Sequence, residues 1–189
     1  AASPPPSAGR EPLLAFVGAL DSPHTAEGLR WFVDEVLGPV RRREPRARLI
    51  VAGRRAPEAL RRRLAAAEGV EFRGEVDDVD AVYAASRVFV NPIFAGSGVN
   101  MKVGPPMAAG VPVVSTTFGA RGLGALAEAM LLADGPDDTA DAVLRLLADP
   151  HVRRERAAAG LAAVDAHRPG TTARAYTALI ERVARGSGA

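Results

Sequence analysis

The chain has 189 residues, a formal net charge of +2 and 48% hydrophobic residues, which is enough for one domain with its own core. The absence of cysteine excludes a disulfide framework and cysteine catalysis, and the three scattered histidines lack metal-ligand spacing. The absence of cysteine also fits a reducing, cytoplasmic setting, and no apolar run approaches the ~18 residues that cross a membrane.

The first residues, 1–12, are rich in Pro, Ser and Gly and predict a linker. They contain neither an initial Met nor a signal-peptide pattern, so we expect a piece of a longer protein. An apolar run at 13–17 that ends at Gly18 predicts a buried strand, and residues 25–43 then show helical periodicity. Gly38-Pro39 predicts a kink in that helix.

The remaining chain alternates between short apolar runs and helical patterns. Strands are expected at 48–53, 70–72, 88–90, 111–115 and 130–132. Helices are expected at 57–67, 79–84, 138–148, 151–166 and 171–185, and a further helix, whose start the sequence does not define, should end at 109. We expect Asp78 to cap the helix at 79–84 and Gly110 to end the helix that reaches 109. This order predicts an α/β, Rossmann-like, doubly wound parallel sheet of about six strands with helices on both faces.

In such a sheet, ligands bind beyond the carboxyl ends of the strands. The segment after the fourth expected strand contains Gly96-Ser97-Gly98 and then Lys102, the one lysine among 24 basic residues. A Gly-Ser-Gly turn that leads into a helix lets backbone N–H groups approach an anion, and Lys102 would add a full charge one turn in. This suits a diphosphate. The alternative is that the glycines only make a tight turn, since the segment matches neither a Walker A loop nor the dinucleotide fingerprint.

Two arginine runs, 41–43 and 61–63, fall in helical stretches that also carry carboxylates. This pattern is typical of a solvated helix face. The alternative is contact with a phosphorylated ligand or with anionic lipid headgroups, which would place the protein peripherally at the inner face of a membrane. No nucleic acid is expected, because no aromatic residues interleave with the basic runs.

A longer string continues from the Gly-rich segment. The residues that carry it are 96–103, 107–116 and 119–123. This string closely resembles the donor-binding domain of retaining GT-B glycosyltransferases of the group 1, or family 4, type. Segments 16–20, 28–32, 45–53 and 70–78 resemble the same domain in the expected order. The resemblance covers roughly 13–185, so we expect residues 13–186 to form one half of a GT-B fold, with the N-terminal acceptor domain outside this chain.

The resemblance implies a glycosyltransferase of the hexosyltransferase type that binds a UDP- or GDP-linked sugar and faces its acceptor domain across a cleft. The acceptor would be a lipid-linked saccharide, a polysaccharide or a small molecule. The implied diphosphate-binding residues are Gly18, Arg54, Gly96, Ser97, Gly98, Asn100 and Lys102. Val76, Asp78 and Pro105 are implied near the base or ribose. The resemblance implies no metal or other cofactor, because protein cations and helix dipoles would stabilise the departing diphosphate. It also implies no catalytic residue in this half.

The sequence departs from the family pattern at three places. At one of them, Ala95 stands where many relatives, though often not those with Gly-Ser-Gly, carry a second acidic residue. Pro105 stands where relatives usually carry a Glu that contacts the donor ribose, and Pro105-Pro106 should break the helix or begin a new one. The region 19–24 replaces an Arg and a Lys that many relatives carry after the first strand.

These departures leave two alternatives open. One is a degenerate, non-catalytic module that binds a nucleotide weakly or serves as a structural partner. The other is a nucleotide-sugar epimerase, which needs acid–base residues beside the sugar. The candidate acid–base residues are Asp21, His24, Asp77, Asp78 and Asp134.

Overall fold

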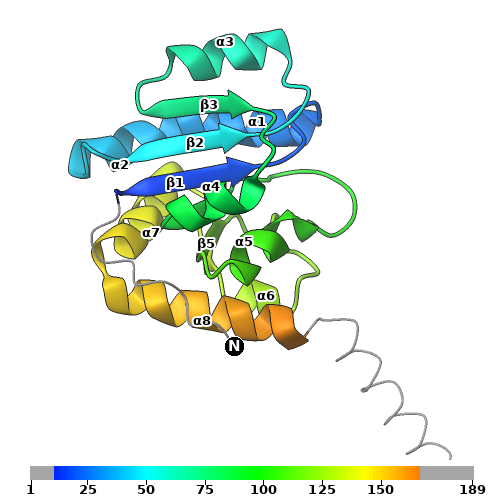
Figure 1. Ribbon diagram of the computed structural model, residues 1–189, viewed down its shortest axis with the longest axis vertical. Coiled ribbons are helices and arrows are strands. Elements are labelled where there is room, and N and C mark those ends of the chain that lie inside the picture. Colours follow the sequence, from blue (N-terminus) through cyan, green and yellow to red (C-terminus); the bar gives the residue numbers. More distant parts are fainter. Residues whose placement is uncertain (1–10, 167–189) are drawn as a thin grey trace, which may run out of the picture.

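A computed structural model of the chain describes residues 11–166. Six parallel strands form one sheet in the order β3-β2-β1-β4-β5-β6, and Figure 1 shows the first three as stacked arrows. The strands are β1 Leu13–Val17, β2 Arg48–Ala52, β3 Val70–Gly74, β4 Val88–Asn91, β5 Val113–Ser115 and β6 Leu131–Leu132. The predicted sheet is confirmed. Most of the expected linker, and the helix expected at 171–185, lie outside the described residues.

The sheet is buried on both faces, which explains why its strands read as continuous apolar runs. Along β1, Leu14 and Phe16 face one hydrophobic cluster, whereas Leu13 and Ala15 face the other. All four side chains are at most 7% exposed. Two cores of this kind are what a doubly wound sheet requires, because each face must be covered by its own helices.

The first face is covered by one long helical segment and two further helices. They are α1 Pro23–Trp31, the π-helical turn η1 Phe32–Val36, α2 Leu37–Arg43, α3 Glu58–Ala66 and α7 Pro136–Ala148. A kink was predicted at Gly38-Pro39, and the structure has a π turn just before these residues, in which Leu37 N–H donates to the carbonyl of Phe32. A proline ring clashes with the carbonyl four residues earlier, here that of Glu35, and a widened turn relieves the clash without ending the helix.

The second face carries three short helices and the long helix α8. They are α4 Val79–Ala85, α5 Gly104–Ala108, α6 Ala125–Glu128 and α8 Pro150–Ala166. Asp78 caps α4 as predicted, because its carboxylate accepts from Ala81 N–H at 2.9 Å. In Figure 1, α8 runs along the lower edge beside α5 and α6. No pattern in the sequence indicated α6, which has only 4 residues.

Strand β1 pairs with both β2 and β4, so the chain changes direction in the sheet between β1 and β4. The carboxyl ends of these strands lie at the same edge, where Figure 1 shows the green loop before α5 extending past the arrowheads. A crevice at such a switch point is the usual ligand position in open α/β sheets.

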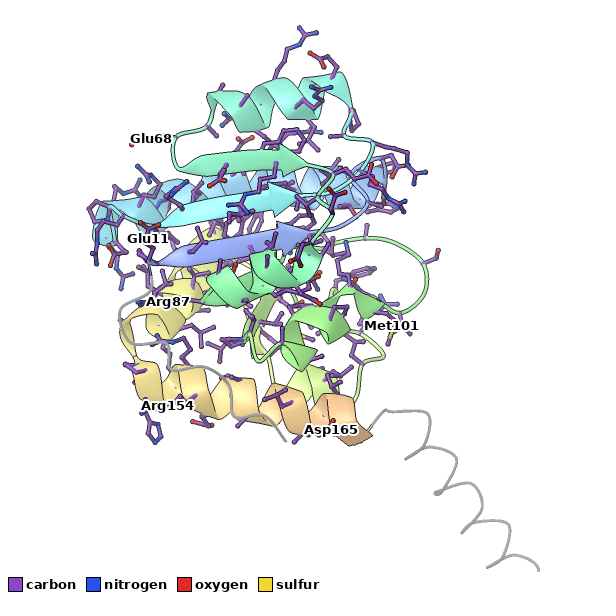
Figure 2. All side chains as sticks on the ribbon, in the orientation of Figure 1. Glu11, Glu68, Arg87, Met101, Arg154 and Asp165 are labelled. Carbon is purple, nitrogen blue, oxygen red and sulfur yellow. The ribbon has the colours of Figure 1, made fainter. Side chains whose placement is uncertain are left out.

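The arginine runs lie on helix surfaces and form ion pairs with carboxylates. Arg41 contacts Glu68 at 2.5 Å, and Arg62 contacts Glu58 at 2.9 Å. Glu68 lies at the end of the molecule opposite Met101 in Figure 2, away from the Gly-rich loop. These pairs favour the solvated helix face, and contact with a membrane surface stays a prediction. Within residues 11–166, no helix combines the length and apolar character that crossing a membrane would require.

Candidate functional site

The exits of β1 and β2 are joined by their backbones. Gly18 N–H donates to the Ala52 carbonyl at 3.1 Å, and Leu20 N–H donates to the Arg54 carbonyl at 3.0 Å. A Cβ placed on Gly53 would lie 2.0 Å from the Gly18 carbonyl oxygen, so this close approach requires glycine. The two predicted site residues Gly18 and Arg54 are therefore neighbours at one edge of the sheet.

Two arginines follow β2, and they differ in their partners. Arg55 adopts a left-handed backbone conformation (φ 57°) and pairs with Asp21 at 2.6 Å. Arg54 is exposed, and within residues 11–166 no carboxylate forms an ion pair with it. Its guanidinium is thus available to an anion at the strand exits.

Lys102 extends from the Gly-rich segment to the exit of β1. Its ammonium donates to Thr25 Oγ1 at 3.1 Å and lies 5.4 Å from the centre of the Phe16 ring. A Cβ placed on Gly18 would lie 3.6 Å from Lys102 Nζ. Burial lowers the pKa of Lys102 to about 8, and no carboxylate among the described residues pairs with it. The site therefore contains a half-buried cation with no protein counter-charge.

The Gly-rich turn lies beside the start of α1. Gly96 and Gly98 have φ values of +137° and +83°, a backbone conformation that residues other than glycine rarely adopt. A Cβ on Gly96 would lie 3.6 Å from His24 Cδ2, whereas a Cβ on Gly98 would meet nothing within 4 Å. Gly96, Ser97 and Gly98 are all exposed, so their backbone groups face open space beside His24.

Asn100 ties this turn to a buried polar cluster. Its amide donates to Asn91 Oδ1 at 2.9 Å, and the Asn91 amide donates to Ser115 Oγ at 2.9 Å and to the Gly119 carbonyl at 3.3 Å. Asn91 is fully buried. The structure thus places Asn100 as an anchor of the loop, and its predicted contact with the diphosphate stays a prediction.

Sequence reasoning missed the buried cluster itself. Asn91 and Ser115 each end an otherwise apolar strand, and β4 and β5 are neighbours in register at these two residues. A polar residue at the carboxyl end of a buried strand was the available signal, because buried polar groups must find partners.

The helix expected directly after the Gly-Ser-Gly turn begins later than predicted. Lys102 lies in the single 3₁₀ turn η2 Met101–Val103, and α5 begins only at Gly104. The expectation that Lys102 lies one turn into a helix is therefore wrong. Pro105 and Pro106 lack N–H groups and are tolerated only in a first helical turn, so they set the start of α5. With 5 residues, α5 adds little dipole at this site, and the charge of Lys102 matters more.

The residues predicted near the base follow β3. Val76 is half-buried against the second core, and the Asp78 carboxylate is engaged in the cap of α4. Strand β3 is separated from β1 by β2, so these residues lie at the same edge but farther from the Gly-rich turn. Pro105 is exposed in the first turn of α5.

The carboxylates considered for acid–base chemistry are mostly engaged in structural contacts. Asp21 pairs with Arg55, and Asp134 accepts from Thr117 N–H and Oγ1, both at 2.8 Å. Asp78 caps α4, which leaves Asp77 exposed at the β3 exit. Among residues 11–166, no group of three or more His, Asp or Glu side chains is arranged to hold a metal ion.

The model of the family described as glycosyl transferases group 1 matches residues 11–149. The chain belongs to this family. A curated relative, described as an uncharacterized 44.6 kDa protein in the cps region of Klebsiella pneumoniae, is 29% identical over 118 residues. That match covers 59% of this chain and 30% of the relative.

Solved structures of glycosyltransferases share the fold of this glycosyltransferase domain. Sucrose-phosphate synthase from Thermosynechococcus elongatus is 23% identical with a TM-score of 0.66, over 94% of this chain and 46% of that one. Anabaena HepE, in complex with UDP and glucose, is 15% identical with a TM-score of 0.68, and the match covers 92% of this chain and 48% of HepE. The UDP-forming alpha,alpha-trehalose-phosphate synthase from Burkholderia vietnamiensis is 18% identical with a TM-score of 0.68, and the match covers 92% of this chain and 46% of the synthase. The chain thus spans less than half the length of these proteins and corresponds to part of a GT-B fold.

Proposed function

We propose that this chain is the donor-binding domain of a retaining glycosyltransferase and that it holds the diphosphate of a UDP- or GDP-linked sugar. The observation that carries the proposal is the Lys102 ammonium, half-buried at the exit of β1 without a carboxylate partner among the described residues. A desolvated cation with no protein counter-charge favours an anionic ligand.

The neighbouring groups fit a diphosphate. The exposed Gly96-Ser97-Gly98 backbone would donate N–H groups to phosphate oxygens, and Arg54 would reach the same anion from the β2 exit. When the glycosidic bond breaks, negative charge accumulates on the departing diphosphate, and Lys102 and Arg54 would stabilise it there. In this proposal the protein supplies the positive charge without a metal ion.

The acceptor would be bound by a second domain of the longer protein, across a cleft from this edge of the sheet. Two comparisons support the proposal: HepE is solved with UDP and glucose, and the curated relative is described by its cps region. We extend the proposal to sugar transfer in the biosynthesis of a polysaccharide, at the cytoplasmic side of a membrane.

Calorimetric titration of the chain with UDP, GDP and ADP tests the proposal. We expect one nucleotide to bind, and Lys102→Ala to weaken it by roughly tenfold to a hundredfold through loss of a charged contact. Arg62→Ala, which removes an exposed arginine of α3, is the matched control and should leave the affinity unchanged. Binding that is the same in wild type and Lys102→Ala would overturn the proposed site.

One observation favours the degenerate module as a second candidate. Pro105 is exposed in the first turn of α5, and its ring offers no hydrogen bond to a ribose. If no nucleotide binds to the wild type at millimolar concentration but Pro105→Glu restores binding, the domain has lost its donor role. If the wild type binds and Pro105→Glu adds little, the ribose is held by other groups.

A further inference from the structure

Thr25 is the hydrogen-bond partner of Lys102, although the two residues are 77 positions apart. Thr25 lies near the start of α1, is only 5% exposed, and accepts from Lys102 Nζ at 3.1 Å. The ammonium is bounded by β1 on another side, where the Phe16 ring and Gly18 approach it. Contacts from α1 and β1 therefore hold one end of a long, flexible side chain whose other end belongs to η2.

The Thr25 hydroxyl differs from that of the other buried helical threonine in how it is used. Thr139 in α7 is also 5% exposed, and its hydroxyl donates to the carbonyl of Gly135 in the preceding turn at 2.7 Å. Such a bond within the helix is the usual choice for a helical threonine. For Thr25 Oγ1, the described residues offer Lys102 as the one hydrogen-bond partner. The Thr25 side chain is thus committed to the lysine rather than to its own helix.

Thr25 also explains how a cation remains at this position. Moving an ammonium out of water without a carboxylate is unfavourable, and a single neutral acceptor offsets part of the loss. Without it, the flexible stem of Lys102 would let the ammonium turn outward to solvent. The acceptor therefore holds the ammonium in position and, as a hydrogen-bond acceptor, favours its protonated form.

We propose that Thr25 is a positioning residue, which holds the Lys102 ammonium at the exit of β1 in the orientation that receives the donor diphosphate. Only the statement that the ammonium receives the donor diphosphate rests on the proposed function. Thr25 makes no contact with the ligand itself in this proposal. Its effect passes through Lys102, so it should be visible on that side chain before any nucleotide is added.

The composition of the chain makes this test direct. Lys102 is the one lysine in the sequence, so labelling with lysine that carries ¹³C at Cε gives a single side-chain signal by NMR. Its chemical shift is followed against pH in the 189-residue chain and in three variants. Thr25→Val removes the acceptor at nearly constant volume, Thr25→Ser retains it, and Thr139→Val is the matched control.

We expect Thr25→Val to lower the midpoint of the Lys102 titration by about half a pH unit, because the ammonium loses its acceptor. Thr25→Ser and Thr139→Val should titrate like the wild type. In calorimetry, Thr25→Val should weaken the nucleotide that the wild type binds by roughly fivefold, and Thr25→Ser by less than about twofold. Thermal unfolding of each variant confirms that it folds.

A midpoint that is the same in Thr25→Val and wild type would overturn the positioning role, whether or not a nucleotide binds. A shifted midpoint with unchanged nucleotide affinity would overturn the link to the donor. If the wild type binds no nucleotide while the midpoint still shifts in Thr25→Val, the proposed function fails and the control of Lys102 by Thr25 stands.

Discussion

The carbonyl oxygen of Pro92 occupies the space that a side chain on Gly28 would need, at 1.6 Å from the position of its Cβ. Helix α1 and the loop after β4 are therefore in backbone contact. This contact brings Thr25, one turn earlier in α1, next to the segment that carries Lys102. The position of the candidate site thus depends on a glycine that contributes no group to it.

Replacing Gly28 by Ala should destabilise the protein, although Ala favours a helix more than Gly does. The added methyl group would force α1 away from the loop, and overpacking of this kind costs about 2 kcal/mol of unfolding free energy. Urea unfolding measures the change. Glu27→Ala, at the exposed neighbouring position of α1, is the control and should stay within about 0.5 kcal/mol of the wild type. An unchanged midpoint in Gly28→Ala would contradict the close contact.

The affinity for a nucleoside diphosphate should depend on pH through Lys102. Burial lowers the pKa of this amine to about 8, so the ammonium form is lost from the free protein as pH rises through 8. Because the anion binds the ammonium form, affinity should be highest below pH 8 and fall about tenfold between pH 7 and pH 9. Calorimetry across this range measures the profile.

Lys102→Arg provides the control for this profile, because a guanidinium stays charged over the whole range. Its binding profile should be flat, whatever its absolute affinity. A flat profile for the wild type would show that the charge of Lys102 does not contribute to binding.

Replacing Asn91 by Ala should lower the unfolding free energy by about 2 kcal/mol, because the Gly119 carbonyl and the Asn100 amide lose a buried partner. The Asn91 side chain is fully buried and supports both contacts. Asn100→Ala, at the partly exposed end of the cluster, should cost less than half as much. Equal losses in denaturant unfolding would mean that the cluster is not centred on Asn91.

Asp78 allows capping to be separated from ligand binding. Asp78→Ala removes the acceptor for Ala81 N–H and should cost about 1 kcal/mol, whereas Asp78→Asn preserves a cap and should be nearly neutral. Thermal unfolding distinguishes the two variants, with Asp77→Ala as an exposed control. If Asp78→Asn keeps stability but weakens nucleotide binding, Asp78 lies near the ligand, as the resemblance implies.

The sheet could be predicted because its signal is local. Each strand is an apolar run bounded by turn residues, and the strand at 13–17 was predicted with the bounds that the structure gives it. The cap at Asp78 was likewise readable, since a cap depends on residues within one helical turn. The alternation of strands and helices predicted a parallel, doubly wound sheet, but the order of its strands was not predicted and comes from the structure.

Several residues that the sequence singled out, among them Gly18 and Lys102, lie together in the structure, but their contacts could not be predicted. Lys102 stood out as a lone lysine, yet its partner Thr25 comes from a helix 77 positions away, and no local pattern connects them. The start of α5 was misjudged because the glycine turn suggested a helix, while Pro105 and Pro106 decide where one can begin. Asn91 was missed because its importance depends on the register between β4 and β5.

The π turn at Phe32–Val36 closes its hydrogen bond over five residues, whereas an α-helical turn closes it over four. One additional residue in a regular α-helix would rotate everything downstream by about 100°, and a wider turn accommodates that residue without the rotation. Here the residues on both sides of the turn, Leu29 and Val40, remain fully buried against the same core. Homologues could therefore gain or lose a residue in this helix without changing a loop, and alignments of the family should allow a gap at this point.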